Sequence, residues 1–413
     1  MTVYEKSILL TPYIKNIIRP QKCGRCYCNK ERNLIKYNKF DKSNSIKLSN
    51  TGDIMEHKNL IDLEYMTKDE LEQTIRLAKV IKSRPDVYKH ACDGKIMATL
   101  FYEPSTRTQM SFQAAMLRLG GKTIGFDNPM NSSVAKGENL KDTITIISSY
   151  SDIIAMRHPS EGSAKAGSIY SSVPLINCGD GGHFHPTQTL TDVCTLSFEK
   201  GRLDHLRIGL CGDLLNGRTV HSLIKTMSRF EGNSFVLIST KELSVPRYIK
   251  DIMDNAGCEY TEVNNLQDAI AQLDVLYMTR IQRERFINDE EYQKQKGVFV
   301  LDTEKLKLAK EDLIILHPLP RVDEIAIEVD DDPRACYFKQ AEYGMYGRMA
   351  LIVLLLRPEG AFTFSTPDPI IKKNSKCPNE KCITNDPQQF YLPRNTYEKN
   401  GGFFCDYCDS KIE

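Results

Sequence analysis

The sequence predicts an α/β protein with two doubly wound parallel-sheet domains, an interdomain cleft and a small C-terminal four-cysteine zinc domain. Three observations lead to this prediction. Short apolar runs alternate with helical segments from about Met55, the alternation restarts after about residue 190, and two cysteine pairs close the chain. Strands that alternate with helices at this spacing form parallel sheets covered on both faces. The 413 residues can hold two or three domains, each with its own core.

The first domain is predicted to span residues 55–190. Its opening helix places Leu71, Ile75 and Ala78 on one apolar face, and the run IMATLF forms its first strand. The predicted helices are 68–82, 111–119 and 139–150, and the predicted strands are 96–101, 122–126, 153–156 and 174–177.

The second domain is predicted to span residues 191–340, and an apolar helix within residues 341–357 is expected to pack back on the first domain. Ligands of such folds bind at the carboxyl ends of the strands. The predicted helices are 186–196, 218–230 and 341–356, and the predicted strands are 207–211, 234–239, 260–263, 275–279, 298–301 and 313–316.

Residues 1–54 differ from the rest of the chain. They carry 11 Lys and Arg against 4 Asp and Glu, a net charge of +7, which leaves −6 for the remainder because the whole chain carries +1. We expect a disordered basic extension; a targeting peptide or translation from Met55 are alternatives. Cys23, Cys26 and Cys28 could bind a metal, but no fourth ligand stands at a suitable spacing.

Composition also excludes some partners. The acidic body argues against nucleic-acid binding, which depends on neutralising phosphates. The longest apolar run, Met349 to Leu356, is eight residues and too short to span a bilayer. The other cysteines are scattered through the two domains without a visible signal peptide, so the sequence predicts a reducing, cytoplasmic location.

The C-terminal tail carries the metal-site signal. A linker over residues 358–376 is rich in Pro, Thr, Ser and Lys, and residues 377–413 follow with Cys377-x4-Cys382 and Cys405-x2-Cys408. Two thiolate pairs about two dozen residues apart match a structural zinc site with four cysteine ligands. The alternative is four unrelated thiols.

The stretch FYEPSTRTQM (101–110) joins the first predicted strand to a helix. It places Ser105, Thr106, Arg107 and Thr108 where free backbone N–H groups and the positive end of the helix dipole meet. Hydroxyls and a guanidinium at such a point can hold a phosphate. A capping box between Thr106 and Gln109 is the alternative interpretation, because both use the same residue types.

Other predicted strands also end in polar residues, and each could by itself be structural. Their common position at the carboxyl ends of the strands favours one site for a multiply anionic substrate set. The candidates are Arg157, His185, Gln188, Arg218, Arg280, Gln282, Arg285 and the segment His317 to Arg321, with Ser132 and Lys136 on the loop NSSVAKGE.

Seven motifs in order make residues 55–357 closely resemble the catalytic chain of the aspartate carbamoyltransferase family. They are FYEPSTRT, SSVAKGE, MRHP, HPTQTLTD, GDLLNGRTVHSL, YMTRIQRER and HPLPRVDEI. The tail from Cys377 resembles the zinc domain of that family's regulatory chain, whereas nothing resembles the nucleotide-binding domain of that chain. The resemblance implies transfer of a carbamoyl group from carbamoyl phosphate to L-aspartate in pyrimidine (UMP) biosynthesis, with no catalytic cofactor and with structural Zn²⁺ in the tail.

The resemblance also implies roles for the site residues. Ser105 to Thr108 would hold the phosphate, and Thr108, Arg157 and His185 would polarise the carbamoyl oxygen, so Arg107, Thr108, Arg157 and His185 form the expected catalytic set. The carbamoyl NH₂ would meet Gln188 and the carbonyl groups of Leu319 and Pro320. The aspartate carboxylates would bind Arg218, Arg280 and Gln282.

The family resemblance further implies a homotrimer, in which Ser132 and Lys136 reach the carbamoyl phosphate and aspartate of a neighbouring subunit. Glu103 is expected to pair with Arg218 and Arg285 and hold a closed state, and the tail is expected to dock on its own or a neighbouring chain. An ornithine carbamoyltransferase is the nearest rival, but Pro318 stands where that enzyme has a Cys before Leu-Pro. A non-catalytic scaffold and a nucleic-acid-binding zinc module are the remaining alternatives.

Overall fold

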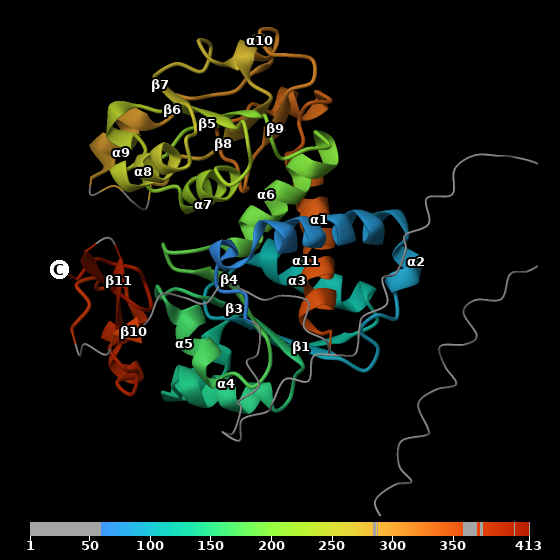
Figure 1. The fold of residues 1–413 in the computed structure, drawn as a ribbon, viewed down its shortest axis with the longest axis vertical. Helices are drawn as coiled ribbons and strands as arrows, with labels where there is room; N and C mark the ends of the chain where they lie inside the picture. The colour runs from blue at the N-terminus through green and yellow to red at the C-terminus, as the bar shows by residue number, and fades with distance from the viewer. Residues whose placement is uncertain are drawn as a thin grey trace, which may run out of the picture. The chain divides into compact units, whose positions relative to one another are not determined.

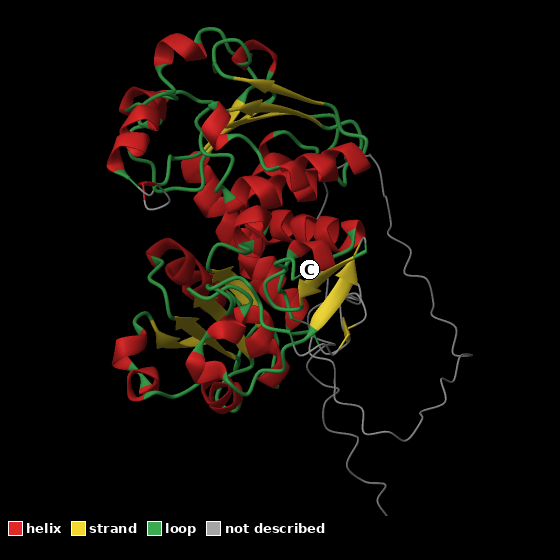
Figure 2. Cartoon of the chain, turned by 90° about the vertical axis from the view of Figure 1, so that its left-hand side faces the viewer, coloured by secondary structure: helices red, strands yellow, loops and turns green. Residues whose placement is uncertain are grey.

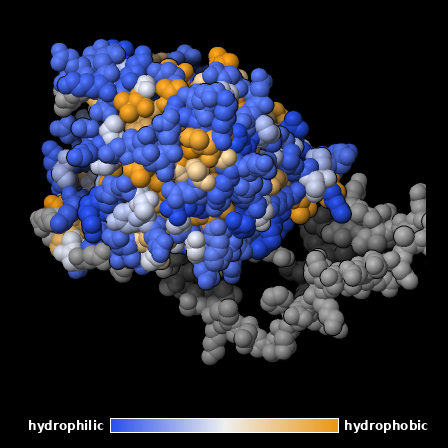
Figure 3. Space-filling view, turned by 90° about the horizontal axis from the view of Figure 1, so that it is seen from above, coloured by the Kyte–Doolittle hydropathy of each residue, from blue (hydrophilic) through white to orange (hydrophobic). Residues whose placement is uncertain are grey.

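The computed structural model describes residues 59–283, 286, 288–357, 370–371, 375–399 and 401–412 (Figure 1). The predictions for residues 1–54, for most of the linker and for Arg285 therefore lie outside the described residues. No helix within the described ranges is both long and apolar enough to cross a membrane. The face drawn in Figure 3 is largely hydrophilic, with apolar residues in small groups.

The first sheet is parallel, in the order β2-β1-β3-β4. The chain leaves β1 toward β2 and then returns to the other side for β3, so the strand order reverses between β1 and β3. Such a switch point opens a crevice at the carboxyl ends of the strands. The elements are α1 (Lys68–Ser83), α2 (Pro85–Tyr88), β1 (Ile96–Phe101), α3 (Thr106–Arg118), β2 (Lys122–Phe126), α4 (Leu140–Ser148), β3 (Ile153–His158), α5 (Ser163–Tyr170) and β4 (Leu175–Asp180).

The second sheet is also parallel, in the order β7-β6-β5-β8-β9, and its switch point lies between β5 and β8. The strands of the two large sheets occupy separate parts of the fold, each beside helices (Figure 2). The elements are α6 (Pro186–Glu199), β5 (Arg207–Cys211), α7 (Arg218–Met227), β6 (Ser234–Ile238), α8 (Arg247–Asn255), β7 (Tyr260–Val263), β8 (Val275–Met278), α9 (Asp289–Gln295), α10 (Thr303–Leu306), β9 (Ile314–Leu316) and α11 (Tyr337–Leu355).

Helix α11 packs against α1, α3 and α6, as the expected return to the first domain requires. It is buried along most of its length, so its sequence is apolar on nearly every side. At Gly344 an added Cβ would lie 2.4 Å from the Thr191 hydroxyl oxygen, so the close approach of α11 to α6 requires glycine there.

The predicted two-domain α/β fold is confirmed, with local corrections. The predicted strand at residues 298–301 is wrong: Leu301 makes an isolated bridge with Ile325, Val298 is exposed, and the sheet ends at β9. Helix α3 begins at Thr106, before the apolar pattern that starts at Ser111. Helices α2, α5, α8, α9 and α10 were not predicted from the sequence.

The tail folds around an antiparallel sheet of β10 (Ile370–Ile371), β11 (Thr396–Lys399) and β12 (Gly402–Cys405). Strand β10 comes from the segment predicted to be a linker. The four cysteines of the tail are all buried, and they share a core with residues of β1, β3, α4 and α5.

Candidate active site

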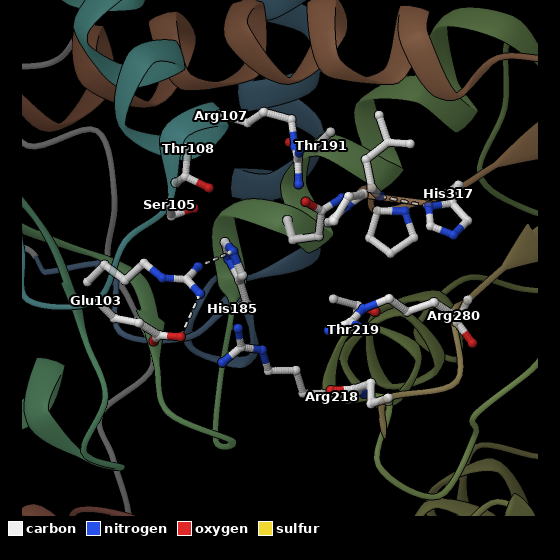
Figure 4. Close-up of a pocket in the computed structure, with 18 of the residues that line it drawn as sticks. Glu103, Ser105, Arg107, Thr108, His185, Thr191, Arg218, Thr219, Arg280 and His317 are labelled. Atoms are coloured by element: carbon white, nitrogen blue, oxygen red, sulfur yellow. Dashed lines mark hydrogen bonds and ion pairs between the residues drawn. The ribbon is translucent and has the colours of Figure 1, made fainter. Parts of the chain in front are cut away.

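A cavity of about 710 Å³ is lined by residues from the carboxyl ends of both large sheets and from α11 (Figure 4). It brings together thirteen of the residues proposed from sequence, which are Glu103, Ser105, Thr106, Arg107, Thr108, Arg157, His185, Gln188, Arg218, Arg280, Gln282, Leu319 and Pro320. Side chains that are dispersed over more than 200 residues of sequence therefore meet in one place.

The turn between β1 and α3 forms one wall of the cavity. Ser105 is the N-cap of α3, and no side chain makes a capping hydrogen bond there. The capping box, which was the alternative interpretation, is therefore not formed; the Gln109 side chain instead donates to the Phe126 carbonyl oxygen at 3.2 Å. Because the first N–H groups of a helix have no intrahelical partner, this turn is suited to bind an anion. Thr108 is buried beside it, whereas Thr106 and Arg107 are exposed.

Arg157 and His185 form the floor between the two loops that follow β3 and β4. Arg157 Nη1 lies 3.5 Å from His185 Nε2, and Arg157 Nη2 donates to Glu103 Oε1 at 3.3 Å. A Cβ at Gly179 would lie 3.2 Å from Arg157 Nη1, so glycine keeps this space open. The predicted pairing of Glu103 with Arg218 and Arg285 stays a prediction, since Glu103 contacts Arg157 in this structure.

His185 is uncharged at neutral pH. Its burial, followed by the positive charges of Arg218, Arg157 and Arg348, holds the pKa of the imidazole well below its usual value. A neutral imidazole can donate one hydrogen bond from a ring nitrogen without placing another charge among these arginines. This histidine is therefore suited to polarise an oxygen and unsuited to act as a cationic acid.

The Gln188 side chain is hydrogen-bonded to the buried carboxylate of Asp192. Asp192 Oδ1 accepts from Gln188 Nε2 at 2.8 Å and from Gln340 Nε2 at 2.6 Å, while its Oδ2 accepts from the Tyr277 hydroxyl at 3.1 Å. Burial raises the pKa of Asp192 to about 7, against the lowering effect of these donors. Because the Gln188 amide nitrogen is occupied, its carbonyl oxygen is the polar atom left to accept from a ligand NH₂.

The second sheet supplies the opposite wall. Arg218 is the first residue of α7, after the carboxyl end of β5, and Arg280 follows β8. Both strands flank the switch point of this sheet. The HPLP segment after β9 is fixed by His317, whose Nδ1 accepts from the Leu319 N–H at 2.8 Å and whose Nε2 lies 2.7 Å from Glu324 Oε1. The loop carbonyl groups therefore line a fixed edge of the cavity.

Several residues that line this cavity were not proposed from sequence, among them the polar residues Arg348, Gln340 and Lys381. Arg348 is buried in α11, where it donates to the Ser111 hydroxyl at 3.2 Å and lies over the Phe112 ring. Burial lowers the pKa of Arg348 to about 10, so it remains a cation. An arginine within the apolar run GRMALIVLLL was the signal available for it.

Ser132 and Lys136 do not line the cavity of their own chain. They lie on two consecutive 3₁₀ turns after β2, and Lys136 is exposed. Exposed apolar side chains lie on the same turns and on the neighbouring elements β2 and α3, namely Met110, Leu117, Ile124 and Met130.

The tail brings Cys377, Cys382, Cys405 and Cys408 together, with all four sulfur atoms within 4.8 Å of one another. Cys377 Sγ lies 3.5 Å from Cys408 Sγ, and Cys382 Sγ lies 3.7 Å from Cys405 Sγ. Tetrahedral zinc with Zn–S bonds of about 2.3 Å requires sulfur atoms about 3.8 Å apart. The hydroxyl groups of Thr384 and Ser410 lie near Cys382 and Cys408, so the donor set and spacing fit zinc.

The tail packs against the first domain of its own chain. Glu161 pairs with it through backbone and side chain: its N–H donates to the Lys381 carbonyl oxygen at 2.9 Å, and its Oε2 accepts from Asn379 Nδ2 at 2.6 Å. Lys165 Nζ donates to Asp406 Oδ1 at 2.5 Å, and an added Cβ at Gly162 would lie 2.6 Å from Tyr407. Lys381 reaches the rim of the cavity from this contact.

Comparison with known proteins agrees with this geometry. The sequence model for the aspartate/ornithine carbamoyltransferase carbamoyl-P binding domain matches residues 58–197, and that for the Asp/Orn binding domain matches residues 204–355. An aspartate carbamoyltransferase catalytic subunit of Clostridium botulinum (strain Alaska E43 / Type E3) is 59% identical over 304 residues, which are 73% of this chain and 99% of that protein. One from Clostridium kluyveri is 56% identical over 303 residues, again 73% and 99%.

Solved structures show the same relationship. The catalytic subunit of M. jannaschii aspartate transcarbamoylase is similar with a TM-score of 0.69 and 46% identity, covering 72% of this chain and 97% of that one. The Trypanosoma cruzi enzyme, solved with carbamoyl aspartate and phosphate, has a TM-score of 0.68 and 37% identity, covering 72% and 95%. The chain belongs to the aspartate/ornithine carbamoyltransferase family, on its aspartate carbamoyltransferase branch.

Proposed function

We propose that this chain transfers the carbamoyl group of carbamoyl phosphate to L-aspartate, giving N-carbamoyl-L-aspartate and phosphate, a step of pyrimidine biosynthesis. The observation that carries the proposal is one cavity with an uncapped helix start on one wall and two arginines on the opposite wall. The first suits a phosphate, and the arginines suit two carboxylates. The Trypanosoma cruzi relative solved with carbamoyl phosphate and aspartate supports the same substrate pair.

In the proposed reaction, Ser105 to Thr108 hold the phosphate. Thr108, Arg157 and neutral His185 donate to the carbamoyl oxygen, where negative charge grows as the aspartate nitrogen attacks. Gln188 and the carbonyl groups of Leu319 and Pro320 orient the NH₂ group. A C–N bond forms, the bond from the carbamoyl carbon to the phosphate oxygen breaks, and the amine proton passes to the leaving phosphate.

The acceptor is assigned by charge. Arg218 and Arg280, with Gln282 beside them, offer planar donors for two carboxylates, whereas ornithine has one carboxylate and a second amine. The assay supplies the purified chain with carbamoyl phosphate and either L-aspartate or L-ornithine, and it measures carbamoylated product and phosphate. We expect carbamoylated product with L-aspartate and none with L-ornithine. Turnover of ornithine would overturn the assignment, and the absence of turnover with both would favour a scaffold.

We further propose a homotrimer with shared sites. Lys136 and Ser132 lie outside the cavity of their own chain, and the apolar side chains of β2, α3 and the adjoining turns are exposed, as at a subunit interface. Arg107→Ala and Lys136→Ala should each be inactive, and a reassembled mixture should recover activity because some sites combine two intact halves. A mixture without recovery, or a monomeric mass by sedimentation, would contradict shared sites.

The tail is proposed to hold one structural Zn²⁺ on its four cysteines, which would stabilise the fold of the tail. Metal analysis should find one zinc per chain, and Cys405→Ser should lower both the zinc content and the melting temperature. Lys399→Ala is the control, because this exposed tail residue leaves all four thiols and the neighbouring hydroxyl groups in place. A chain free of metal at full stability would contradict the site. The six other described cysteines are free thiols, which supports a reducing, cytoplasmic location.

A further inference from the structure

His183 lies two residues before His185, on the loop that joins β4 to α6, and it does not line the cavity. Its side chain is only 10% exposed and sits between two carboxylates. Nδ1 lies 3.1 Å from Asp180 Oδ2, and Nε2 lies 3.1 Å from Asp409 Oδ2. One carboxylate belongs to the first domain and the other to the tail, so this imidazole joins the two.

Both nitrogens of this ring must donate. Ionised carboxylates only accept hydrogen bonds, so the two contacts can both form only when the imidazole carries two protons and a positive charge. Burial would lower the pKa of His183, but Asp180 and Asp409 outweigh it and raise the pKa to about 10. The bridge is therefore formed throughout the neutral range.

Asp180 organises the loop that follows it. Its Oδ1 accepts from the Phe184 N–H at 2.9 Å and from Asn177 Nδ2 at 3.1 Å, and its Oδ2 accepts from the Gly162 N–H at 2.9 Å. The same carboxylate thus fixes both ends of the segment 180–184, directly before His185. His183 is the member of this network that reaches out of the first domain.

Asp409 is fixed by the cysteine cluster. It directly follows Cys408, its N–H donates to the Cys405 carbonyl oxygen at 3.0 Å, and its Oδ1 accepts from the Tyr397 hydroxyl at 3.0 Å. Its φ of 55° lies in the left-handed region, which Asp tolerates better than most residues. The position of this carboxylate therefore depends on the fold of the four-cysteine site.

We propose that His183 is a positioning residue through which the four-cysteine tail, by way of Asp409, holds the loop that presents His185 to the cavity. The effect on catalysis rests on the proposed function, whereas the coupling itself concerns only the order of the loop. When the bridge is broken, residues 180–185 lose their outer support and His185 loses its alignment with Arg157. The phosphate turn follows β1, and Arg218 and Arg280 follow β5 and β8, so none of them belongs to the loop that the bridge holds, and substrate binding should change little.

The test compares Asp409→Ala with Asp406→Asn. Asp406 is a matched control, because it follows Cys405 as Asp409 follows Cys408, yet it pairs with Lys165 on α5 rather than with the loop. In Asp409→Ala we expect faster hydrogen exchange in residues 179–186 and a kcat lowered roughly tenfold to hundredfold, the order of loss that misplaced catalytic groups cause. The KM for carbamoyl phosphate should stay within about twofold of the original value, and Asp406→Asn should resemble the original chain in both readouts.

His183→Gln provides the second variant, since it leaves every tail residue in place. It should reproduce the faster exchange in residues 179–186 while the metal content stays at the level of the original chain. Unchanged exchange in His183→Gln, or equal effects of Asp409→Ala and Asp406→Asn, would overturn the proposal. Hydrogen exchange is measured without substrate, so the two proposals can fail separately. If the variants exchange faster but the original chain does not carbamoylate aspartate, the proposed function is refuted and the coupling between tail and loop stands.

Discussion

Acid should destabilise this chain in part through His158, the residue that follows Arg157 at the end of β3. Its ring packs 4.6 Å from the Tyr102 ring, and its Nδ1 accepts from the Ser160 N–H at 3.0 Å. Burial lowers the pKa of His158 from 6.5 to about 4, although Asp386 and Asp180 raise it slightly. In the unfolded chain the same imidazole takes up a proton near its ordinary value.

The direction of the change in stability with pH follows from which state, folded or unfolded, binds the proton more tightly. Between the two pKa values, the unfolded state binds more protons than the folded state, so stability is full above about pH 6.5 and falls as the pH drops toward 4. At about pH 5 the linkage relation gives a loss of about 2 kcal/mol in the free energy of unfolding, relative to pH 8. His183 acts in the opposite direction, because its folded-state pKa is raised.

The assay uses His158→Asn, whose side-chain oxygen can still accept from Ser160 while it cannot titrate. Urea unfolding at pH 8 and pH 5, followed by circular dichroism, gives the change in unfolding free energy for each chain. The original chain should lose about 2 kcal/mol more than the variant, and the contribution of His183 cancels in this comparison. His90→Asn, at an exposed histidine, is the control. Equal losses in the original chain and in His158→Asn would refute the reasoning.

Three further predictions concern the cavity. His185→Ala should lower kcat by about 10²- to 10³-fold with an unchanged melting temperature, since it removes one donor to the carbamoyl oxygen; a smaller effect would assign that role elsewhere. Asp192→Ala should lower kcat/KM for carbamoyl phosphate by roughly tenfold, because Gln188 loses its acceptor; normal kinetics in this folded variant would contradict the anchoring role. Lys381→Glu should lower kcat/KM by about two- to tenfold at low salt and less at high salt, whereas the exposed tail variant Lys399→Glu should not; equal effects would exclude a local charge at the rim.

Much of the site could be predicted from sequence because of a property of parallel sheets. The carboxyl ends of all strands in such a sheet lie at one edge, so polar residues that follow predicted strands are expected to meet. Arg157 near the carboxyl end of β3, Arg218 after β5 and Arg280 after β8 were found in this way, and all three line the cavity. The local pattern at the start of α3 could not separate a cap from an anion site, because both use the same residue types; the family resemblance added the phosphate site, and the structure has no side-chain cap there.

The rest depended on contacts that no local pattern encodes. Gln340 reaches Asp192 across 148 positions of sequence, and Arg348 enters the cavity from a helix whose apolar pattern indicates only a core element. The strand predicted at residues 298–301 failed because apolar character alone does not distinguish a strand from a buried loop. The location of the tail was open because a linker of about 20 residues reaches as far as about 66 Å.

The place where the tail docks links its metal site to the chemistry of the cavity. Strands β3 and β4 are neighbours. Arg157 lies in β3 just before the loop that follows this strand, His185 lies at the end of the loop that follows β4, and both residues line the cavity. The tail meets the outer side of the same two loops: Glu161 pairs with Lys381 and Asn379, and His183 pairs with Asp409. Because the tail contacts both adjacent loops, it restricts how the nearby cavity-lining residues Arg157 and His185 can move relative to each other. Since donors that stabilise a transition state must be held before the reaction begins, the proposed coupling makes a docked tail favour catalysis even though its cysteines do not line the cavity.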